Sequence, residues 1–289
     1  MSEAATFDAL IPAAMAEKAA QAGVKKAQSS FVTLFALGVL AGAFIAIGGL
    51  FSTVATAGAA GMLPYGVIRT IAGLAFGLGL IMVVVGGAEL FTGNTLIVMA
   101  FASGKVSFSA LLRNWAIVYA GNLMGAIGMA VLVHASGVLD MGDGAVGATA
   151  AAIAQAKLAL DPGQAFMRGI LCNILVCLAV WMCFAARSAT GKVAVILFPV
   201  TAFVALGFEH SVANMYLIPV AMLHQGGEID LFLLFANLVP VTAGNIIGGG
   251  LLVALTYWLI YLRPAQARET VAARVVASKD EPGPVREES

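Results

Sequence analysis

The chain has 289 residues, of which 61% are hydrophobic and only 10% are charged. Soluble domains carry about 25% charged residues, so the composition excludes an ordinary soluble protein and predicts an integral membrane protein. Lysine and arginine balance aspartate and glutamate at 15 each, which argues against a basic surface for nucleic acid.

Residues 1–30 precede the first long apolar segment and lack the apolar core of a secretory signal peptide. Apolar side chains recur at helical spacing over residues 7–20. This pattern predicts an amphipathic helix on the cytoplasmic face, acting either as an interfacial anchor or as a gating element. Residues 264–289 are charged and predict a disordered cytoplasmic tail, which leaves 31–263 as the transmembrane domain.

Six apolar segments follow one another within this domain, and about 20 residues suffice for one membrane span. No segment shows the alternation of a β-barrel strand. The chain is therefore predicted to be an all-α membrane protein with six transmembrane helices, at residues 31–55, 68–102, 110–136, 165–186, 193–223 and 230–262.

The distribution of lysine and arginine predicts the orientation of these spans. If both termini are cytoplasmic, 12 of the 15 basic residues fall on the inside, and the outer side keeps only Arg69, Lys157 and Arg168. The bias predicts that both termini are cytoplasmic.

The second and fifth segments each contain the pattern G-x-E-x4-N. It reads Gly87 to Asn94 in the second segment and Gly207 to Asn214 in the fifth. Glycine and polar residues in the middle of a span predict that helices 2 and 5 are broken, and a broken backbone at membrane depth must be buried or line a cavity.

A second pattern, N-x5-A-G-N-x2-G, begins at Asn114 in the third segment and at Asn237 in the sixth. Segments 1–3 and 4–6 therefore form two repeats of three spans each. Because three is odd, the two halves must be inverted, as in many transport folds whose broken helices meet near the midplane.

Ionisable residues inside a membrane mark either a transport path or a buried polar network. We expect Glu89 and Glu209 to stabilise the two breaks rather than to bind an anion, which a carboxylate would repel. A permeant cation would reverse that preference. The same broken-helix network is expected to include Asn94, Asn122, Ser211, Asn214 and Asn245.

The two breaks differ at the residues next to the glutamates. His210 follows Glu209, whereas Leu90 follows Glu89, and Thr92 adds a hydroxyl at the first break. Half-helix N-termini favour anions, and a histidine can donate or accept a proton near neutral pH. We favour a functional His210 over a merely structural one.

The same residues resemble the formate/nitrite transporter family, and within it most closely the formate channel. The resemblance covers about residues 9–263 and rests on the two breaks and on three longer motifs: 207–215, 173–181 and 239–250 running into 256–263. The chain departs from that pattern in its shorter connection between segments 5 and 6.

The resemblance implies an aquaporin-like protomer and a homopentamer in which each protomer has its own pore. It also implies that Thr92 and His210 form the central polar pair, with Glu209 behind the histidine and Lys157 attracting anions in a vestibule. The substrate pathway would further include the apolar constrictions and their neighbours: Phe76, Leu80, Phe203, Leu90, Val176, Asn173 and Asn245.

The predicted function is passive or proton-linked transport of small monovalent anions, most readily formate, in a bacterial inner membrane with its lipids. Either His210 relays a proton and the neutral acid crosses, or cationic His210 pairs with the anion. Nitrite, hydrosulfide and acetate are the alternative substrates. An aquaporin-like neutral-solute channel is disfavoured because Asn-Pro-Ala motifs are missing. A receptor or scaffold role stays open. The sequence shows no enzyme motif, metal cluster or cofactor loop.

Overall fold

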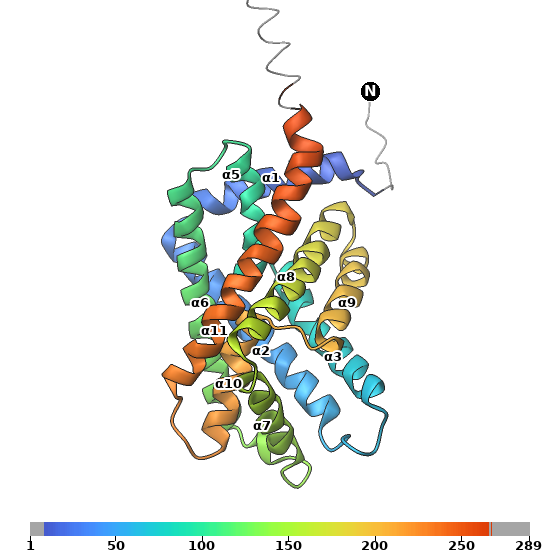
Figure 1. Ribbon diagram of the computed structural model, residues 1–289, viewed down its shortest axis with the longest axis vertical. Coiled ribbons are helices and arrows are strands. Elements are labelled where there is room, and N and C mark those ends of the chain that lie inside the picture. Colours follow the sequence, from blue (N-terminus) through green and yellow to red (C-terminus); the bar gives the residue numbers. More distant parts are fainter. Residues whose placement is uncertain (1–8, 266, 268–289) are drawn as a thin grey trace, which may run out of the picture.

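The computed structural model describes residues 9–265 and 267, which form helices and connecting turns without a strand among them. The all-α prediction is therefore confirmed for this part of the chain. The principal helices (Figure 1) are α1 (Pro12–Gln28), α2 (Phe31–Thr56), α3 (Tyr65–Gly86), α4 (Phe91–Asn94), α5 (Val98–Ala102), α6 (Phe108–Ala135), α7 (Ala145–Leu158), α8 (Pro162–Ala185), α9 (Ala189–Ala205), α10 (Ser211–His224) and α11 (Leu231–Ile246).

Within the described residues, five helices are long and apolar enough to cross a membrane: 31–56, 65–86, 108–135, 162–185 and 231–265. The last of these includes α11 and two π-helical stretches, η3 (Ile247–Leu255) and η4 (Trp258–Leu262). The fifth predicted segment consists of α9 and α10, which have 17 and 14 residues and are each shorter than a full span. The six-span layout remains an interpretation of these lengths.

Both predicted breaks are confirmed. The helix α3 ends at Gly86, and Gly87 takes a left-handed φ of 79° before the chain runs extended to Phe91. The second break has the same form, with Gly207 at φ 72° between α9 and α10. Glycine suits both positions because a side chain is strained at such angles. The left-handed turn at each glycine redirects the chain, which then starts a new half-helix.

Two helices differ from the sequence prediction. The N-terminal helix was expected over residues 7–20, but α1 begins at Pro12, since proline suits the first helical turn, and continues to Gln28. Helix α7 was not predicted at all, because its Ala-rich sequence carries no clear apolar periodicity, although alanine is the best helix former. Figure 1 shows α1 across one end of the bundle and α7 at the opposite end.

The glycines of the repeated N-x5-A-G-N-x2-G pattern lie where helices cross closely. A Cβ on Gly125 of α6 would lie 2.0 Å from the carbonyl oxygen of Val39 in α2. A Cβ on Gly248, at the matching position of η3, would lie 2.2 Å from the carbonyl oxygen of Ile170 in α8. Small residues allow such contact between membrane helices, so the repeated motif encodes the same crossing in both halves.

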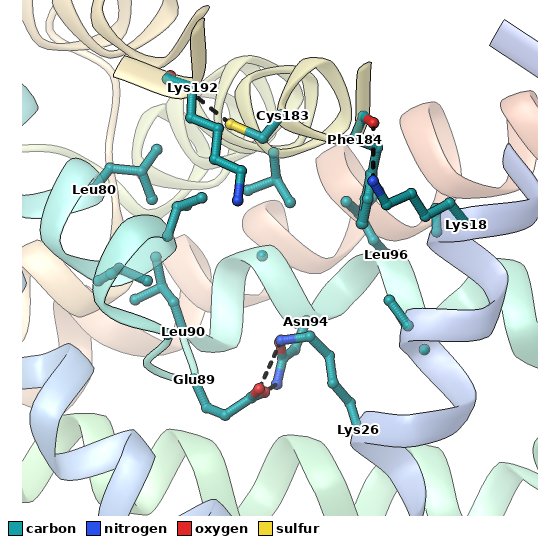
Figure 2. Close-up of a pocket in the computed structure, with 18 of the residues that line it drawn as sticks. Lys18, Lys26, Leu80, Glu89, Leu90, Asn94, Leu96, Cys183, Phe184 and Lys192 are labelled. Carbon is teal, nitrogen blue, oxygen red and sulfur yellow. Dashed lines mark hydrogen bonds and ion pairs between the residues drawn. The ribbon is translucent and has the colours of Figure 1, made fainter. Parts of the chain in front are cut away.

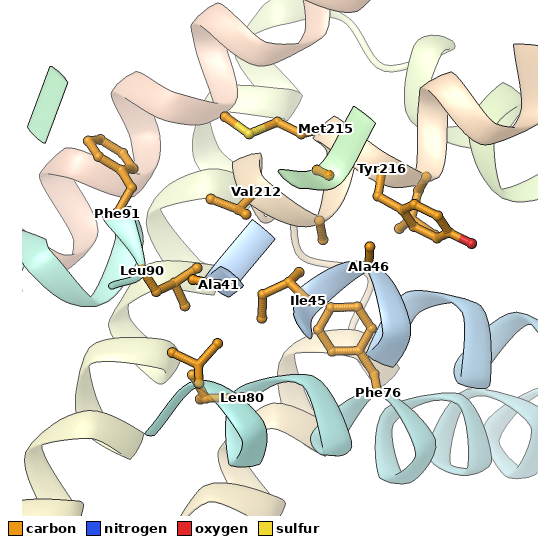
Figure 3. Packing of buried hydrophobic residues seen from close by; sticks show 14 of the residues in the cluster. Ala41, Ile45, Ala46, Phe76, Leu80, Leu90, Phe91, Val212, Met215 and Tyr216 are labelled. Carbon is orange, nitrogen blue, oxygen red and sulfur yellow. The ribbon is translucent and has the colours of Figure 1, made fainter. Parts of the chain in front are cut away.

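The apolar core is centred between the two breaks. Figure 3 shows Ile45 of α2 beside Phe76 and Leu80 of α3, with Leu90 from the first break and Val212 from α10 close by. All five side chains are buried. This apolar cluster lies beside the two breaks, since Leu90 and Val212 belong to it.

We predict that Gly125→Ala lowers stability, because the new Cβ would collide with a backbone oxygen that can move only if α2 and α6 separate. Overpacking of this kind costs roughly 1–3 kcal/mol. Gly128→Ala is the matched control, since nothing lies within 4 Å of a Cβ at Gly128 in the same helix. Thermal unfolding of the detergent-solubilised protein measures the difference, and equal transitions for both variants would contradict this interpretation of the crossing.

Candidate functional site

Two buried asparagines join the broken backbone to neighbouring helices. The Asn122 Oδ1 accepts a hydrogen bond from the Phe91 N–H at 2.9 Å, and its Nδ2 donates to the carbonyl oxygens of Gly38 and Glu89 at 2.8 and 2.9 Å. Unpaired backbone groups are expensive at membrane depth. The Asn122 side chain therefore pairs with three backbone groups at or beside the first break.

Asn245 makes the same set of contacts at the second break. Its Oδ1 accepts from the Ser211 N–H at 2.9 Å, and its Nδ2 donates to the carbonyl oxygens of Gly169 and Glu209 at 2.8 and 3.0 Å. The contacts place Asn245 in the network that supports the break.

Each glutamate is held by a lysine and an asparagine, and a second asparagine supports both of these residues. At the first break, Lys26 Nζ lies 2.8 Å from Glu89 Oε1 and also donates to Asn94 Oδ1 at 2.9 Å, as Figure 2 shows. Asn94 Nδ2 donates to Glu89 Oε2 at 2.7 Å and to Asn114 Oδ1 at 3.0 Å, and Asn114 donates to the Lys26 carbonyl oxygen. The carboxylate is thus both paired and hydrogen-bonded.

The second break repeats this network with different helices. Lys157 Nζ of α7 lies 3.0 and 3.1 Å from the two carboxylate oxygens of Glu209. Asn214 Nδ2 donates to Glu209 at 2.7 Å and to Asn237 Oδ1 at 2.8 Å, and Asn237 donates to the Lys157 carbonyl oxygen. Helices α1 and α7 therefore supply equivalent lysines, which extends the repeat beyond the three predicted spans.

Thr92 and His210 meet where the two halves come together. Thr92 Oγ1 lies 2.9 Å from His210 Nε2, and both residues are buried. His210 Nδ1 accepts a hydrogen bond from the Ala213 N–H at 3.0 Å, which makes the imidazole the N-cap of α10. Because Nδ1 is an acceptor, the ring proton of neutral His210 resides on Nε2 and is donated to Thr92.

Apolar side chains flank this pair. The rings of Phe76 and Phe203 meet edge to face at 5.7 Å, and the Phe203 ring stacks on His210 at 5.9 Å. Leu80 and Leu90 are buried nearby in the cluster of Figure 3. The polar pair is thus covered by rings and branched hydrocarbon on the two sides predicted to constrict the path.

Two cavities approach this region and share no lining residue. Cavity 1, of about 880 Å³, is lined by Leu80 and Leu90 and by a charged set: Lys18, Lys26, Arg187, Lys192 and Glu89. Cavity 2, of about 640 Å³, is lined by Phe76, Phe203 and His210 and by its own charged set: Arg69, Lys157, Arg168 and Glu209. Cations outnumber carboxylates by four to one in cavity 1 and by three to one in cavity 2, so both favour anions.

The cavities also separate the basic residues by their predicted side of the membrane. All three basic residues assigned to the outside line cavity 2, and the four that line cavity 1 were all assigned to the inside. Cavity 1 is therefore the cytoplasmic candidate.

Four predicted pathway residues line neither cavity. Thr92, Asn173, Val176 and Asn245 are all buried. Asn173 Nδ2 lies within hydrogen-bonding distance of the Thr92 and Asn245 carbonyl oxygens, at 3.2 and 2.7 Å, and therefore joins the two halves directly. Ser211 is held through its N–H, while its buried hydroxyl has no partner among the described residues.

The sequence prediction missed Lys26, Asn114 and Asn237. The two asparagines were visible as the first residues of the repeated N-x5-A-G-N-x2-G motif. Lys26 gave no such signal, because it lies 63 residues before its glutamate, whereas Lys157 lies 52 residues before Glu209. Only the fold shows that the two lysines are equivalent.

Comparisons with known proteins agree on one family. The family model described as formate/nitrite transporter matches residues 13–259. The chain is 44% identical to the formate channel FocA of Escherichia coli K12 over 275 residues, which cover 89% of this chain and 96% of that protein. It is 40% identical to a probable formate transporter of Methanothermobacter thermautotrophicus, covering 87% of this chain and 97% of the relative.

Solved structures give the same result. A pentameric formate channel with formate bound aligns with a TM-score of 0.74 and 46% identity, covering 80% of this chain and 98% of that one. An FNT family ion channel aligns with a TM-score of 0.75 and 29% identity, covering 86% and 98%. The resemblance predicted from the motifs is confirmed, and the chain belongs to the formate/nitrite transporter family.

Proposed function

We propose that this protein is a transmembrane channel for small monovalent anions, with formate as its principal substrate. The observation that carries the proposal is the Thr92–His210 pair, which lies between two cationic cavities and is covered by apolar side chains. The similarity to FocA and to a formate-bound channel supports formate as the substrate. Nitrite and hydrosulfide are the alternatives within the family.

The apolar constrictions favour passage of the protonated acid. Moving an ion into a low-dielectric medium costs tens of kcal/mol by an idealised Born calculation. For a carboxylic acid with a pKa near 4, protonation at pH 7 costs only about 4 kcal/mol. Protonation is therefore the cheaper route past Phe76, Leu80 and Phe203.

The contacts of His210 determine how it can take part in proton transfer. In the resting arrangement the imidazole has a single proton, on Nε2, and releasing it would leave an imidazolate. A second proton, supplied by water in cavity 2, which His210 lines, must first bind Nδ1. It displaces the Ala213 N–H that this nitrogen now accepts. The Nε2 proton can then pass to a carboxylate oxygen, and the ring is left neutral with its proton on Nδ1. The ring regains its resting tautomer when Nε2 takes up a proton and Nδ1 releases one.

The same cap bears on the alternative in which cationic His210 pairs with a bare anion. That version also requires a proton on Nδ1 and the loss of the cap, which is worth about 1 kcal/mol. Pairing would hold the anion in the constriction without lowering the free energy needed to move its charge past the apolar rings. We therefore favour the proton relay over the cationic pair.

Lys26 and Lys157 serve mainly to hold the two breaks. Lys157 is paired with Glu209, and Lys26 with Glu89, so their charges are largely compensated within each network. We propose that both glutamates are structural members of these networks rather than substrate ligands.

The proposal extends to assembly and location. The protein is a multi-pass membrane protein by its apolar helices and its family. We propose a homopentamer in a bacterial inner membrane with both termini cytoplasmic, and no enzymatic activity. Helix α1 belongs to the cytoplasmic segment 1–30, whose gating role remains a prediction. The predicted tail at 264–289 lies outside the described residues, except for 264, 265 and 267.

Uptake into proteoliposomes tests the substrate assignment. We expect formate to enter faster than acetate and lactate, and its uptake to rise as the pH falls from 8 to 5, because the protonated acid becomes more abundant. Nitrite and hydrosulfide are compared in the same preparation. If either of them enters faster than formate, that anion is the principal substrate. Water or glycerol flux equal to that of formate would support an aquaporin-like channel. The absence of any anion flux would support a receptor or scaffold.

We predict that His210→Asn keeps the fold but loses proton-linked transport. Asparagine is a strong N-cap residue and can still donate a hydrogen bond, but it cannot titrate. General acid–base catalysis contributes about 10²–10⁴-fold, so formate uptake at pH 7 should fall by about 100-fold or more. The loss should be smaller at pH 5, where more of the acid is already protonated in solution.

The matched variant is His210→Phe, which also loses the cap on Ala213 and should unfold at a lower temperature than His210→Asn. Unchanged uptake and pH dependence in His210→Asn would contradict the relay.

A further inference from the structure

Cavity 2 contains two arginines that the transport mechanism described above does not use. Arg69 lies in α3 and Arg168 in α8, and both line the cavity together with Lys157 and His210. The predicted outer side of the chain carries no other lysine or arginine apart from Lys157. Since lysine and arginine are depleted on the outer side of membrane proteins, their confinement to one cavity calls for an explanation.

Both guanidinium groups are held at the carboxyl end of α9. Arg69 Nε donates to the Ala205 carbonyl oxygen at 3.3 Å and Nη2 donates to that of Val204. Arg168 Nη1 donates to the Gly207 carbonyl oxygen at 3.4 Å. Arginine at a helix C-terminus satisfies carbonyl groups and complements the helix dipole, so this part of the arrangement has a structural role.

Most N–H groups of the two guanidiniums are not used in these contacts. A guanidinium has five N–H groups, and these contacts engage two on Arg69 and one on Arg168. Neither arginine has a carboxylate partner among the described residues, whereas Lys157 is committed to Glu209. The two arginines are therefore the uncompensated cations of cavity 2.

The two groups border a common space beside Gly207. A Cβ placed on this glycine would lie 3.6 Å from Arg69 Nη2 and 3.8 Å from Arg168 Nη1, with no third atom as near. Both guanidinium groups therefore approach the same side of Gly207, where this residue contributes no side chain. Gly207 therefore leaves open the space between them.

We propose that Arg69 and Arg168 form an outer binding site for planar anions with two oxygen atoms, the carboxylate and nitrite class, distinct from the Thr92–His210 pair. Arginine binds such anions through paired N–H groups, and lysine cannot substitute for that geometry. A single-atom anion such as hydrosulfide gains charge attraction but no paired contact. The site concentrates formate in cavity 2 before it reaches the constriction, and this proposal rests on the proposed formate transport.

Right-side-out membrane vesicles from a host without formate channels test the site. Initial uptake is measured over a range of formate and hydrosulfide concentrations for the unmutated protein, Arg69→Gln/Arg168→Gln and Arg69→Lys/Arg168→Lys. We expect the glutamine variant to raise the half-saturating formate concentration roughly three- to tenfold, as for the loss of two partly exposed charge contacts, with maximal flux little changed.

The lysine variant separates anion recognition from charge. It should also raise the half-saturating formate concentration while leaving hydrosulfide uptake near that of the unmutated protein. Lys105→Gln is the control, since Lys105 is exposed and lines neither cavity, and it should leave the half-saturating concentration for external formate unchanged.

Two results would overturn the site. One is an unchanged half-saturating formate concentration in both double variants, and the other is a fall in maximal flux alone with a lower unfolding temperature, which indicates only the capping role. These results leave formate transport intact. The absence of formate flux in the unmutated protein would instead overturn the proposed function, and the outer site with it.

Discussion

The central constraint on this fold is that two helices stop and restart at membrane depth, where the freed backbone groups have no water to bind. The carboxamides of Asn122 and Asn245 meet this constraint in the same way, each accepting from the first N–H of a half-helix and donating to two carbonyl oxygens. Without them, the half-helices could not hold Thr92 and His210 in contact. The close glycine crossings bring the asparagines near enough to act.

The two halves share their supporting network and differ in their reactive residues. Each break has a glutamate that contacts a lysine and an asparagine, and a second asparagine bonds the first. Only the second break has a histidine as its N-cap. Only the first has a threonine, whose hydroxyl oxygen accepts the hydrogen bond from that histidine. The repeated residues thus support the two broken helices in the same way, and the difference between Leu90 and His210 places a titratable side chain at only one of them.

Much of this arrangement was predictable from sequence because it depends on local patterns used twice. The repeated G-x-E-x4-N motif predicted both breaks, and the second repeat predicted the equivalent asparagines. The contact between Thr92 and His210 was expected from the family resemblance. Helix α7 and the role of Lys26 were not predictable, because an alanine-rich helix has no strong periodicity and the lysine–glutamate spacings differ between the halves. The cap on Ala213, which fixes the tautomer of His210, also depends on geometry that no residue pattern specifies.

In the proposed mechanism, formate crosses the apolar constrictions as a neutral acid. The most direct measurement records electrical current and internal pH together during formate uptake into proteoliposomes. We predict that each formate enters with one proton, so that the lumen acidifies and no net current accompanies the flux. A formate current without linked proton movement would show that the bare anion crosses, and would contradict passage as the neutral acid.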